Sequence, residues 1–495
     1  MQNQIWVYRG GKFKEITNVP GTNEFPCWLG DRIYFVNEKD SKFTLMSVSP
    51  DGGAPKVELP PSVTEIRELS NDGKSLIFEN GPDCQVFDPA TGKATDLEFK
   101  GASDLIHMRN RTVVAEGFAT AVSLTSTGKR ALVEARGQIL SVPFGEGESR
   151  VWKAKAGVRY RDPVMSPDAK FVSYFSDESG DMQLCIANAD GSGERQLTKD
   201  GERHLVNSDW SPDGKWIALN DSNMRLRLVN VATGEDRVIC QQPQIWFGVS
   251  FDFSPDSKWI VHGQSVPITG YGAIELYEIA SGKNTRISDG RSDDTSASFS
   301  SDGKYLAYLS KRSISVTGDP IQNQLNAGPM VLAYIIPLKE STPDPFALKD
   351  ADENVAPPKE EKFEFGVELD GLYDRRIELP VAAGNYNQIG MFGGRVLIGG
   401  DGVIKAFDLA SKVLTDFSPG GFFSSNASKT KILVGMSVSD PSGEGKKIAN
   451  FGGLRLTVEP AAEWKQIFWN AWRLMRDYFY VPNMHGLDWA ATGRK

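Results

Sequence analysis

Charged and aromatic side chains recur shortly before each of several similar turn sequences, and their types and spacing could support chemistry. Guanidinium groups hydrogen-bond carboxylates, so Arg159 and Arg161 could attract them. Asp293 and Asp294 could attract amino termini instead. The alternative is that these residues only pack or carry water inside the fold. The full candidate set is Arg159, Tyr160, Arg161, His204, Trp246, Phe247, Asp293, Asp294, Asn385 and Tyr386.

The turns that follow these candidates share an aromatic or Met residue, a serine, a proline or second serine, and an aspartate. Proline presets φ for a turn and aspartate bonds to nearby backbone, so the pattern is typical of tight turns. The serines are Ser166, Ser211, Ser254 and Ser300, which are 45, 43 and 46 residues apart. A fixed period of this size indicates a repeat architecture, and one period accommodates the four short strands of a β-propeller blade.

Weaker copies of the turn extend the series to nine blade starts, with the additional ones near Trp28, Ser70, Thr125, Phe392 and Phe423. The 55 residues from Ser70 to Thr125 place a propeller boundary near residue 105, with two blades before it and seven after. The sequence therefore predicts an all-β chain with a seven-bladed β-propeller, preceded by two blades of a second propeller and followed by a short helical segment. The candidate residues precede the turn of the innermost strand, so they would edge the central pore.

Composition excludes several classes of function. The chain has 495 residues, of which 40% are hydrophobic and 49 are glycine, as suits a turn-rich β protein. The formal charge of −9 has both signs interspersed, so no basic stripe predicts nucleic-acid binding. No apolar run approaches the ~20 residues of a membrane span, and the first six residues are not a secretory signal. We therefore predict a cytoplasmic protein without a membrane partner.

No metal, cofactor or catalytic motif stands out. The four cysteines are far apart and form no Cys-x-x-Cys pair, which favours reduced thiols. Neither Gly-x-Ser-x-Gly nor His-Glu-x-x-His occurs, so we assign no catalytic residue, cofactor or metal ligand. Residues 188–194 alternate oxygens like a calcium loop but lack the glutamate at position twelve, so we interpret them as a hairpin turn.

Two segments depart from the blade pattern. An insertion at about residues 318–373 contains one strand, 330–337, and a proline- and charge-rich stretch, 350–362, which is either a loop or lid or a plain connector. After Pro460, helical spacing predicts an amphipathic helix that either lies on the propeller or meets a domain outside this chain. Its apolar face would hold Trp464, Ile467, Phe468, Ala471, Trp472, Met475 and Phe479.

The terminal helix also carries the most specific family signal. The run from Glu463 to Tyr480, continued from Val481 to Trp489, resembles the opening of the first catalytic subdomain of the tricorn-type serine peptidases. Residues 363–380 support the likeness, and the blades in order resemble that family's propellers. The blade turn alone is shared by many propellers.

The resemblance implies a domain organisation. Residues 1–105 would be the last two blades of a six-bladed propeller, and residues 110–458 a complete seven-bladed one with the insertion at about 318–373. Residues 459–495 would begin the first catalytic subdomain. His485 does not match the family's catalytic position, so we interpret it as a turn residue beside the helix.

The resemblance also implies a function. The family degrades oligopeptides by acyl-enzyme serine chemistry, assembles as a homo-oligomer and uses its seven-bladed propeller as a filter or entry channel. Its catalytic histidine, serine and PDZ domain lie beyond the residues matched here, so the chain alone is predicted to be inactive, with the remaining catalytic and PDZ domains as partners. The rival interpretation is a non-enzymatic, peptide- or protein-binding propeller of the translocation-associated type.

Overall fold

The computed structural model of the chain describes residues 3–98, 104–199, 201, 203–243, 249–313, 316–319, 324–347 and 364–494, with backbone alone for 316–319 and 324–327. The proline- and charge-rich stretch at 350–362 lies outside the described residues. The chain divides into two compact units, Met1–Leu105 and Ile106–Lys495. Each unit is considered by itself below.

Unit 1 contains two four-stranded antiparallel sheets and a two-stranded hairpin. The sheets are β3 (Thr22–Leu29), β4 (Arg32–Lys39), β5 (Lys42–Val48) and β6 (Lys56–Val57), then β7 (Ile66–Asn71), β8 (Leu76–Asn80), β9 (Asp83–Asp88) and β10 (Lys93–Asp96). The hairpin pairs β1 (Trp6–Arg9) with β2 (Lys12–Glu15). A cluster that includes Cys27, Phe78 and Phe87 joins the two sheets.

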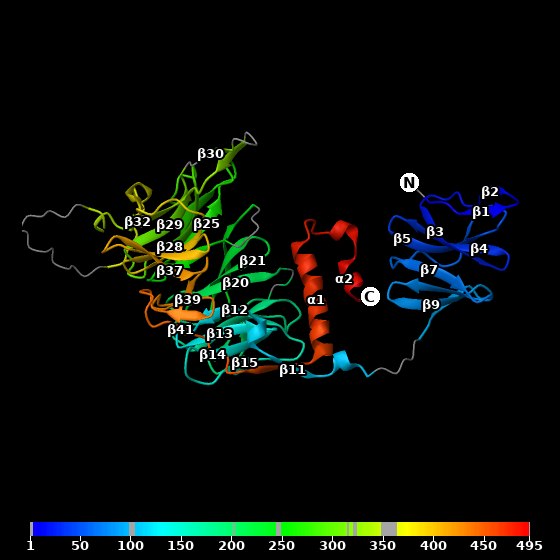
Figure 1. Cartoon of the computed structure of the whole chain (residues 1–495), viewed down its shortest axis with the longest axis horizontal. Helices are drawn as coiled ribbons and strands as arrows, with labels where there is room; N and C mark the ends of the chain where they lie inside the picture. Colours follow the sequence, from blue (N-terminus) through cyan, green and yellow to red (C-terminus); the bar gives the residue numbers. More distant parts are fainter. Residues whose placement is uncertain are drawn as a thin grey trace, which may run out of the picture. The chain divides into compact units, whose positions relative to one another are not determined.

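Unit 2 contains seven four-stranded antiparallel sheets, numbered here 1 to 7 along the chain (Figure 1). Sheets 1 to 4 are β12 (Ala119–Leu124), β13 (Arg130–Ala135), β14 (Gln138–Pro143), β15 (Arg150–Lys153); β16 (Tyr160–Met165), β17 (Phe171–Ser176), β18 (Gln183–Asn188), β19 (Arg195–Gln196); β20 (Leu205–Trp210), β21 (Trp216–Asp221), β22 (Arg225–Asn230), β23 (Asp236–Gln241); and β24 (Phe251–Phe253), β25 (Trp259–Ser265), β26 (Gly272–Glu278), β27 (Lys283–Arg286).

Sheets 5 to 7 complete the series. They are β28 (Asp293–Phe299), β29 (Tyr305–Lys311), β32 (Val331–Pro337), β33 (Ile377–Glu378); β34 (Tyr386–Phe392), β35 (Arg395–Gly400), β36 (Val403–Asp408), β37 (Val413–Pro419); and β38 (Ser424–Ser425), β39 (Ile432–Val434), β40 (Ser437–Ser439), β41 (Lys447–Ile448). The hairpin of β30 (Val316–Asp319) and β31 (Gln324–Ala327) is inserted between β29 and β32 of sheet 5. The strand at 330–337 is therefore the third strand of a regular sheet.

The repeated turns form because each serine and aspartate bond within the turn. In the first, Ser166 Oγ donates to Asp168 Oδ1 at 2.7 Å and accepts from the N–H of Phe171 at 2.9 Å. The turns at Ser211, Ser254 and Ser300 make the same two bonds. The sequence period thus marks one turn geometry, repeated at the end of the innermost strand in sheets 2 to 5.

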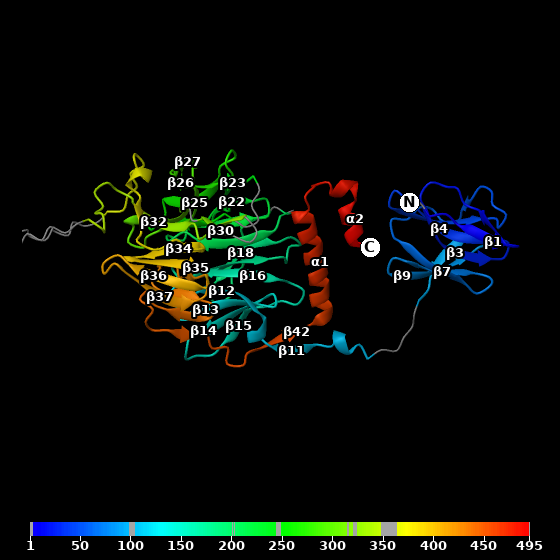
Figure 2. The same cartoon turned by 45° about the horizontal axis from the view of Figure 1, so that its top comes forward.

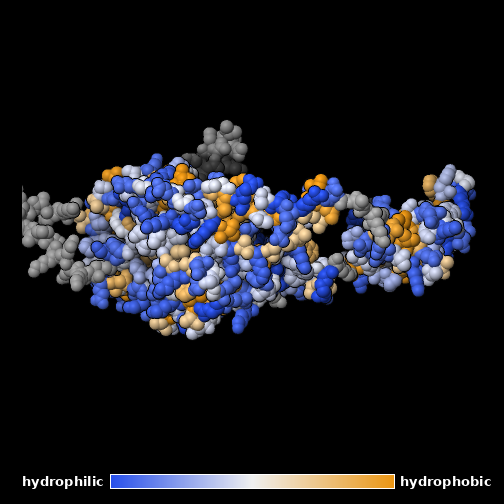
Figure 3. Space-filling model, turned by 90° about the horizontal axis from the view of Figure 1, so that it is seen from below, coloured by the Kyte–Doolittle hydropathy of each residue, from blue (hydrophilic) through white to orange (hydrophobic). Residues whose placement is uncertain are grey.

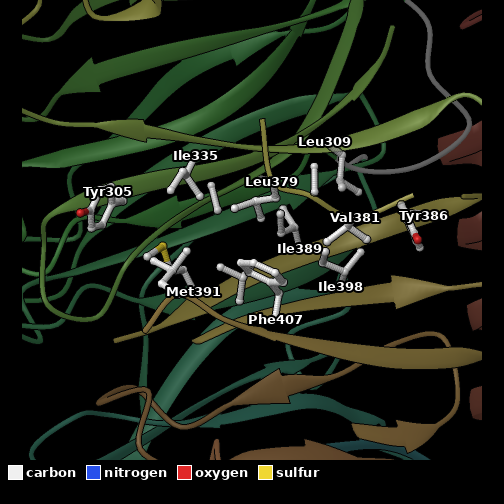
Figure 4. Packing of buried hydrophobic residues seen from close by; sticks show 14 of the residues in the cluster. Tyr305, Leu309, Ile335, Leu379, Val381, Tyr386, Ile389, Met391, Ile398 and Phe407 are labelled. Carbon is white, nitrogen blue, oxygen red and sulfur yellow. The ribbon is translucent and has the colours of Figure 1, made fainter. Parts of the chain in front are cut away.

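The seven sheets close into a ring through apolar clusters. Six clusters each join one sheet to the next along the chain. The cluster between sheets 5 and 6 is typical, with Leu309 and Ile335 packed against Ile389, Ile398 and Phe407 (Figure 4). A seventh cluster joins sheet 7 back to sheet 1, with Leu433 and Val438 against Ala131 and Leu140. The ring is therefore continuous, as a propeller requires.

A two-stranded clasp also spans the ring closure. Strand β11 (Arg111–Val114) pairs antiparallel with β42 (Arg455–Val458), so the segment before sheet 1 is bonded to the segment after sheet 7. Leu456 is fully buried in the cluster that joins these two sheets. The face of the protein seen in Figure 3 is largely hydrophilic, with apolar residues in small groups.

Helix α1 (Pro460–Tyr478) follows the clasp and is succeeded by α2 (Trp489–Arg494). Short 3-10 turns lie at Ile106–Met108, Glu116–Phe118, Tyr373–Arg375 and Met484–Gly486. The predicted C-terminal helix is thus confirmed, with Pro460 in its first turn. The rings of Trp472 and Trp489 stack with centroids 5.9 Å apart and fasten α2 to α1. Figures 1 and 2 show α1 along one face of the ring.

Candidate functional site: the axis of the ring and its two ends

A β-bulge in the innermost strand of sheet 2 allows a side-chain hydrogen bond to the innermost strand of sheet 3. The pairing of β16 with β17 shifts register between Arg161 and Val164, and Asp162 there has a φ of 47°. This bulge lets Asp162 Oδ2 accept from the N–H and the hydroxyl of Ser208, in the first strand of sheet 3. Bulges commonly redirect a side chain in this way, and here one turns a carboxylate towards the neighbouring sheet.

A lysine and an aspartate meet across the ring at its turn end, where the serine turns lie. Lys429, between β38 and β39 in sheet 7, donates to Asp252 Oδ2 in sheet 4 at 2.7 Å. Its ammonium also donates to the carbonyl of Phe299 in sheet 5 at 2.8 Å. Sheets 4 and 7 are three places apart in a ring of seven, so the contact passes through the axis. Lys429 and Asp252 are called the axial pair below.

Two further aspartates lie on the innermost strands of sheets 2 and 3. Asp209 in sheet 3 keeps contact with solvent although protein surrounds it. Burial raises the pKa of Asp209 to about 7, the charges of Asp252 and Asp162 add to the rise, and Lys429 opposes it. Burial likewise raises the pKa of Asp162 to about 6, against the hydrogen bonds from Ser208. Lys429 thus binds Asp252 and also acts on Asp209, whereas Asp162 lies further along the axis, next to Arg161.

The opposite end, beside α1, holds several arginines, most of them paired with carboxylates. Arg161 Nη1 lies 2.6 Å from His204 Nε2, and His204 packs against the ring of Tyr478 in α1. Because arginine stays protonated, the imidazole nitrogen must accept, so His204 is neutral. Burial lowers the pKa of His204 to about 3, and the charges of Arg161, Arg159 and Arg473 lower it further. Arg159 is paired with Glu134 at 3.6 Å, and burial together with Arg161 lowers its pKa.

Helix α1 rests on this end through its polar side. Arg473 forms a buried ion pair with Asp177, in the loop between β17 and β18. Asp177 also accepts from the amide of Gln466 at 2.9 Å. Arg136 binds Glu463 with both guanidinium nitrogens, at 2.6 and 2.8 Å. Grooves of about 600 and 700 Å³ run along α1.

The predicted apolar face of α1 points largely away from the ring. Trp464, Ile467, Phe468 and Met475 are 44–56% exposed, whereas Arg473 is buried. Of the two arrangements that the sequence left open, the helix does lie on the propeller, but with its charged side inward. The ring therefore binds α1 by ion pairs and hydrogen bonds instead of an apolar contact.

Comparison with known proteins decides the family. Residues 119–437 match the family described as "Tricorn protease second beta propeller domain", and residues 460–495 match "Tricorn protease C1 domain". The first match covers more than half of the chain. This chain belongs to the tricorn protease family.

Tricorn relatives are similar over nearly all of the chain. Tricorn protease homolog 1 of Streptomyces coelicolor is 25% identical over 98% of this chain and 50% of its own length. The tricorn protease homolog of Saccharolobus solfataricus is 26% identical over 97% of this chain and 46% of its own. The crystal structure of the tricorn protease has the same fold, with a TM-score of 0.74 at 20% identity, over 99% of this chain and 49% of that chain. The chain spans about half the length of these tricorn proteins.

The other residues predicted to edge the pore differ in burial and in their hydrogen-bond partners. Tyr160 and Tyr386 are buried in inter-sheet clusters. Asp294 is fully buried and accepts from Ser310 and Tyr373. Asp293 pairs with Lys311, and Asn385 bonds to Asp401. Trp246 and Phe247 lie outside the described residues. A pore-edge role for the ten residues stays a prediction.

Sequence reasoning missed the turn-end residues Asp162, Asp209, Asp252 and Lys429. A signal for Lys429 was present, because the corresponding turns carry Gly, Ala or Ser at its position. The predicted hairpin at residues 188–194 is present, with Ser192 bonded to Asp190. Among the described residues, no group of three or more His, Cys, Asp or Glu could hold a metal ion. In that part of the chain, no helix is long and apolar enough to span a membrane.

Proposed function

We propose that this chain is the propeller portion of a tricorn-like serine peptidase, and that the axis of its ring is a selective passage for oligopeptides. The observation that carries the proposal is the ring's polar axis, with Asp209 and the axial pair at one end and Arg161 with His204 at the other. A passage with charge of both signs suits peptides, which carry an ammonium and a carboxylate.

The proposal assigns a role to each part of the chain. Residues 1–105 are the last two blades of a six-bladed propeller, residues 110–458 are the seven-bladed filter, and residues 459–495 begin the catalytic half. The catalytic and PDZ regions complete a cytoplasmic, homo-oligomeric enzyme. The exposed apolar side chains of α1 support this assignment, because such a surface usually marks an interaction site.

Kinetics of the complete enzyme, with the catalytic and PDZ regions joined to this chain, test the proposal. Arg159→Gln with Arg161→Gln removes two positive charges from the α1 end. We expect kcat/KM for a free-carboxylate pentapeptide to fall about 10-fold, with a smaller change for the same peptide amidated, because one lost charged hydrogen bond is worth roughly 1.5–3 kcal/mol.

The matched control is Lys170→Gln, which removes an exposed turn lysine that pairs with Asp168. Its kcat/KM should equal that of the parent enzyme. Unchanged turnover by the double variant, with an unchanged melting temperature, would contradict the passage. If the complete polypeptide bound peptides but hydrolysed none, a binding propeller would be the better description.

A further inference from the structure

Lys429 is an exception among the turns of unit 2. The same N–H to carbonyl bond, three residues apart, closes the turns of sheets 1 to 5 and of sheet 7. The residue that donates it is Gly128, Ala169, Gly214, Ser257 or Gly303 in the other sheets, and Lys429 in sheet 7. Lys429 has a φ of 52°, a conformation that favours glycine. A long side chain stands where the fold needs only a small residue.

The acceptors for this lysine are positioned without it. Asp252 Oδ2 accepts from the hydroxyl of Ser298 and the N–H of Phe299, each at 2.8 Å. These bonds hold the carboxylate between sheets 4 and 5. The ammonium from sheet 7 completes the arrangement at Asp252 Oδ2, the Phe299 carbonyl and, at 3.4 Å, Ser298 Oγ. These three oxygens are called the ammonium cradle.

The charge at the cradle favours a cation whether or not Lys429 fills it. The charges of Asp252 and Asp162 both act on the carboxylate of Asp209, and the charge of Lys429 opposes them. The cradle is also reachable, because Lys429 is 18% and Asp252 21% exposed. A lysine ammonium sits on a flexible four-carbon stem with three donors, so it can leave and return.

We propose that the ammonium cradle is a binding site for the free amino terminus of a peptide, which takes the place of the Lys429 ammonium. The α-ammonium of a peptide has the same charge and donors as the lysine group that fills the site. An N-acetylated peptide lacks that charge and cannot replace it. The inference rests on the proposed passage for oligopeptides and names its selectivity: peptides with a free amino terminus displace Lys429, and blocked peptides do not.

Calorimetric titration of the 495-residue chain with pentaalanine, free or N-acetylated, tests the site. Lys429→Gly empties the cradle and installs the residue that Gly128, Gly214 and Gly303 show to fit this turn. We expect it to bind the free peptide at least 10-fold more tightly than the parent chain and the acetylated peptide unchanged. The control Lys215→Ala removes a turn lysine that is 74% exposed and should change neither affinity.

The outcomes separate the cradle from the passage. If Lys429→Gly left the ratio of the two affinities unchanged while both peptides bound, the cradle would be wrong and the passage would stand. If neither peptide bound to any variant, both proposals would be wrong. A second variant, Lys429→Gly with Asp252→Asn, should lose the gain for the free peptide. Retention of that gain would also contradict the cradle.

Discussion

The two ends of the ring differ in the contacts that span them. At the turn end, one lysine reaches from sheet 7 to a carboxylate of sheet 4 and is surrounded by acidic groups. At the α1 end, several arginines pair with carboxylates, His204 stays neutral beside Arg161, and a whole helix lies on the surface. The contact at the turn end depends on a single, partly exposed side chain, and the contact at the α1 end on several ion pairs and hydrogen bonds. One substitution can therefore remove the first contact but not the second.

The largest loss of stability should follow from breaking the ion pair of Arg473 with Asp177, which holds α1 on the ring. Asp177→Ala leaves the guanidinium of Arg473 buried without its carboxylate, and loss of one partner of a buried pair costs roughly 3–5 kcal/mol. Urea unfolding followed by the fluorescence of the α1 tryptophans measures this loss. Asp181→Ala removes the more exposed partner of Arg476 and should cost only about 0–1 kcal/mol. Equal losses of stability in the two variants would contradict a special contribution of the buried Arg473–Asp177 pair.

Acid should weaken the α1 end next. The pKa of His204 is about 3 in the fold, below its ordinary value of 6.5, so the unfolded chain takes up a proton first as the pH falls. Stability should therefore decline between pH 6.5 and 3, and partial exposure of His204 keeps the loss below the roughly 5 kcal/mol that about 1.4 kcal/mol per pKa unit would give. His204→Gln can still accept from Arg161 and should flatten that decline in melting temperature. A parent-like acid slope in this variant would show that other groups cause it.

The turn end should respond to pH in the opposite direction, and more weakly because water reaches it. The pKa of Asp209 is raised to about 7 from an ordinary 3.8, so the fold retains a proton that the unfolded chain loses. Its contribution is complete below about pH 4 and is lost as the pH rises through 7. Compared with the parent chain, Asp209→Asn should gain more in melting temperature at pH 8 than at pH 5. Identical pH profiles for the parent and Asp209→Asn would contradict the raised pKa of this carboxylate.

The smallest effect belongs to a lysine of the same turns that faces solvent. Lys170 is 73% exposed beside Asp168, so Lys170→Ala should change the free energy of unfolding by less than about 0.5 kcal/mol. Urea unfolding of Lys170→Ala and of Lys429→Gly compares a turn lysine that faces solvent with the one that reaches the axis. A loss above about 1 kcal/mol for Lys170→Ala would mean that turn lysines stabilise the fold whether or not they face the axis.

Much of the ring could be predicted from the sequence, because its turn chemistry is local. Ser166, Ser211, Ser254 and Ser300 bond within their own turns, so the same short pattern gives the same backbone each time. The helix after Pro460 was predictable for the same reason, since its spacing is visible in one segment. Its orientation was not, because Asp177 and Arg473 are almost 300 residues apart in the sequence.

The axis was harder to predict because it depends on register and on contacts between distant sheets. The bulge at Asp162 shifts which side chains of β16 face inward, and no local pattern marks that shift. Lys429 meets Asp252 over 177 positions of sequence. Its sequence signal was a departure from the repeat, namely a lysine where the other turns have Gly, Ala or Ser, and a search for similarity passes over it.

The clasp of β11 and β42 has a mechanical consequence. Arg111, where β11 begins, pairs with Val458, where β42 ends, so both flanking chain segments leave from the same end of the ladder. Tension between those segments loads one rung at a time, starting with Arg111 and Val458, and the clasp peels open like a zipper. The third rung pairs Val113 with Leu456, and both side chains pack in the cluster between sheets 1 and 7. Peeling past the second rung therefore begins to open the cluster that closes the ring.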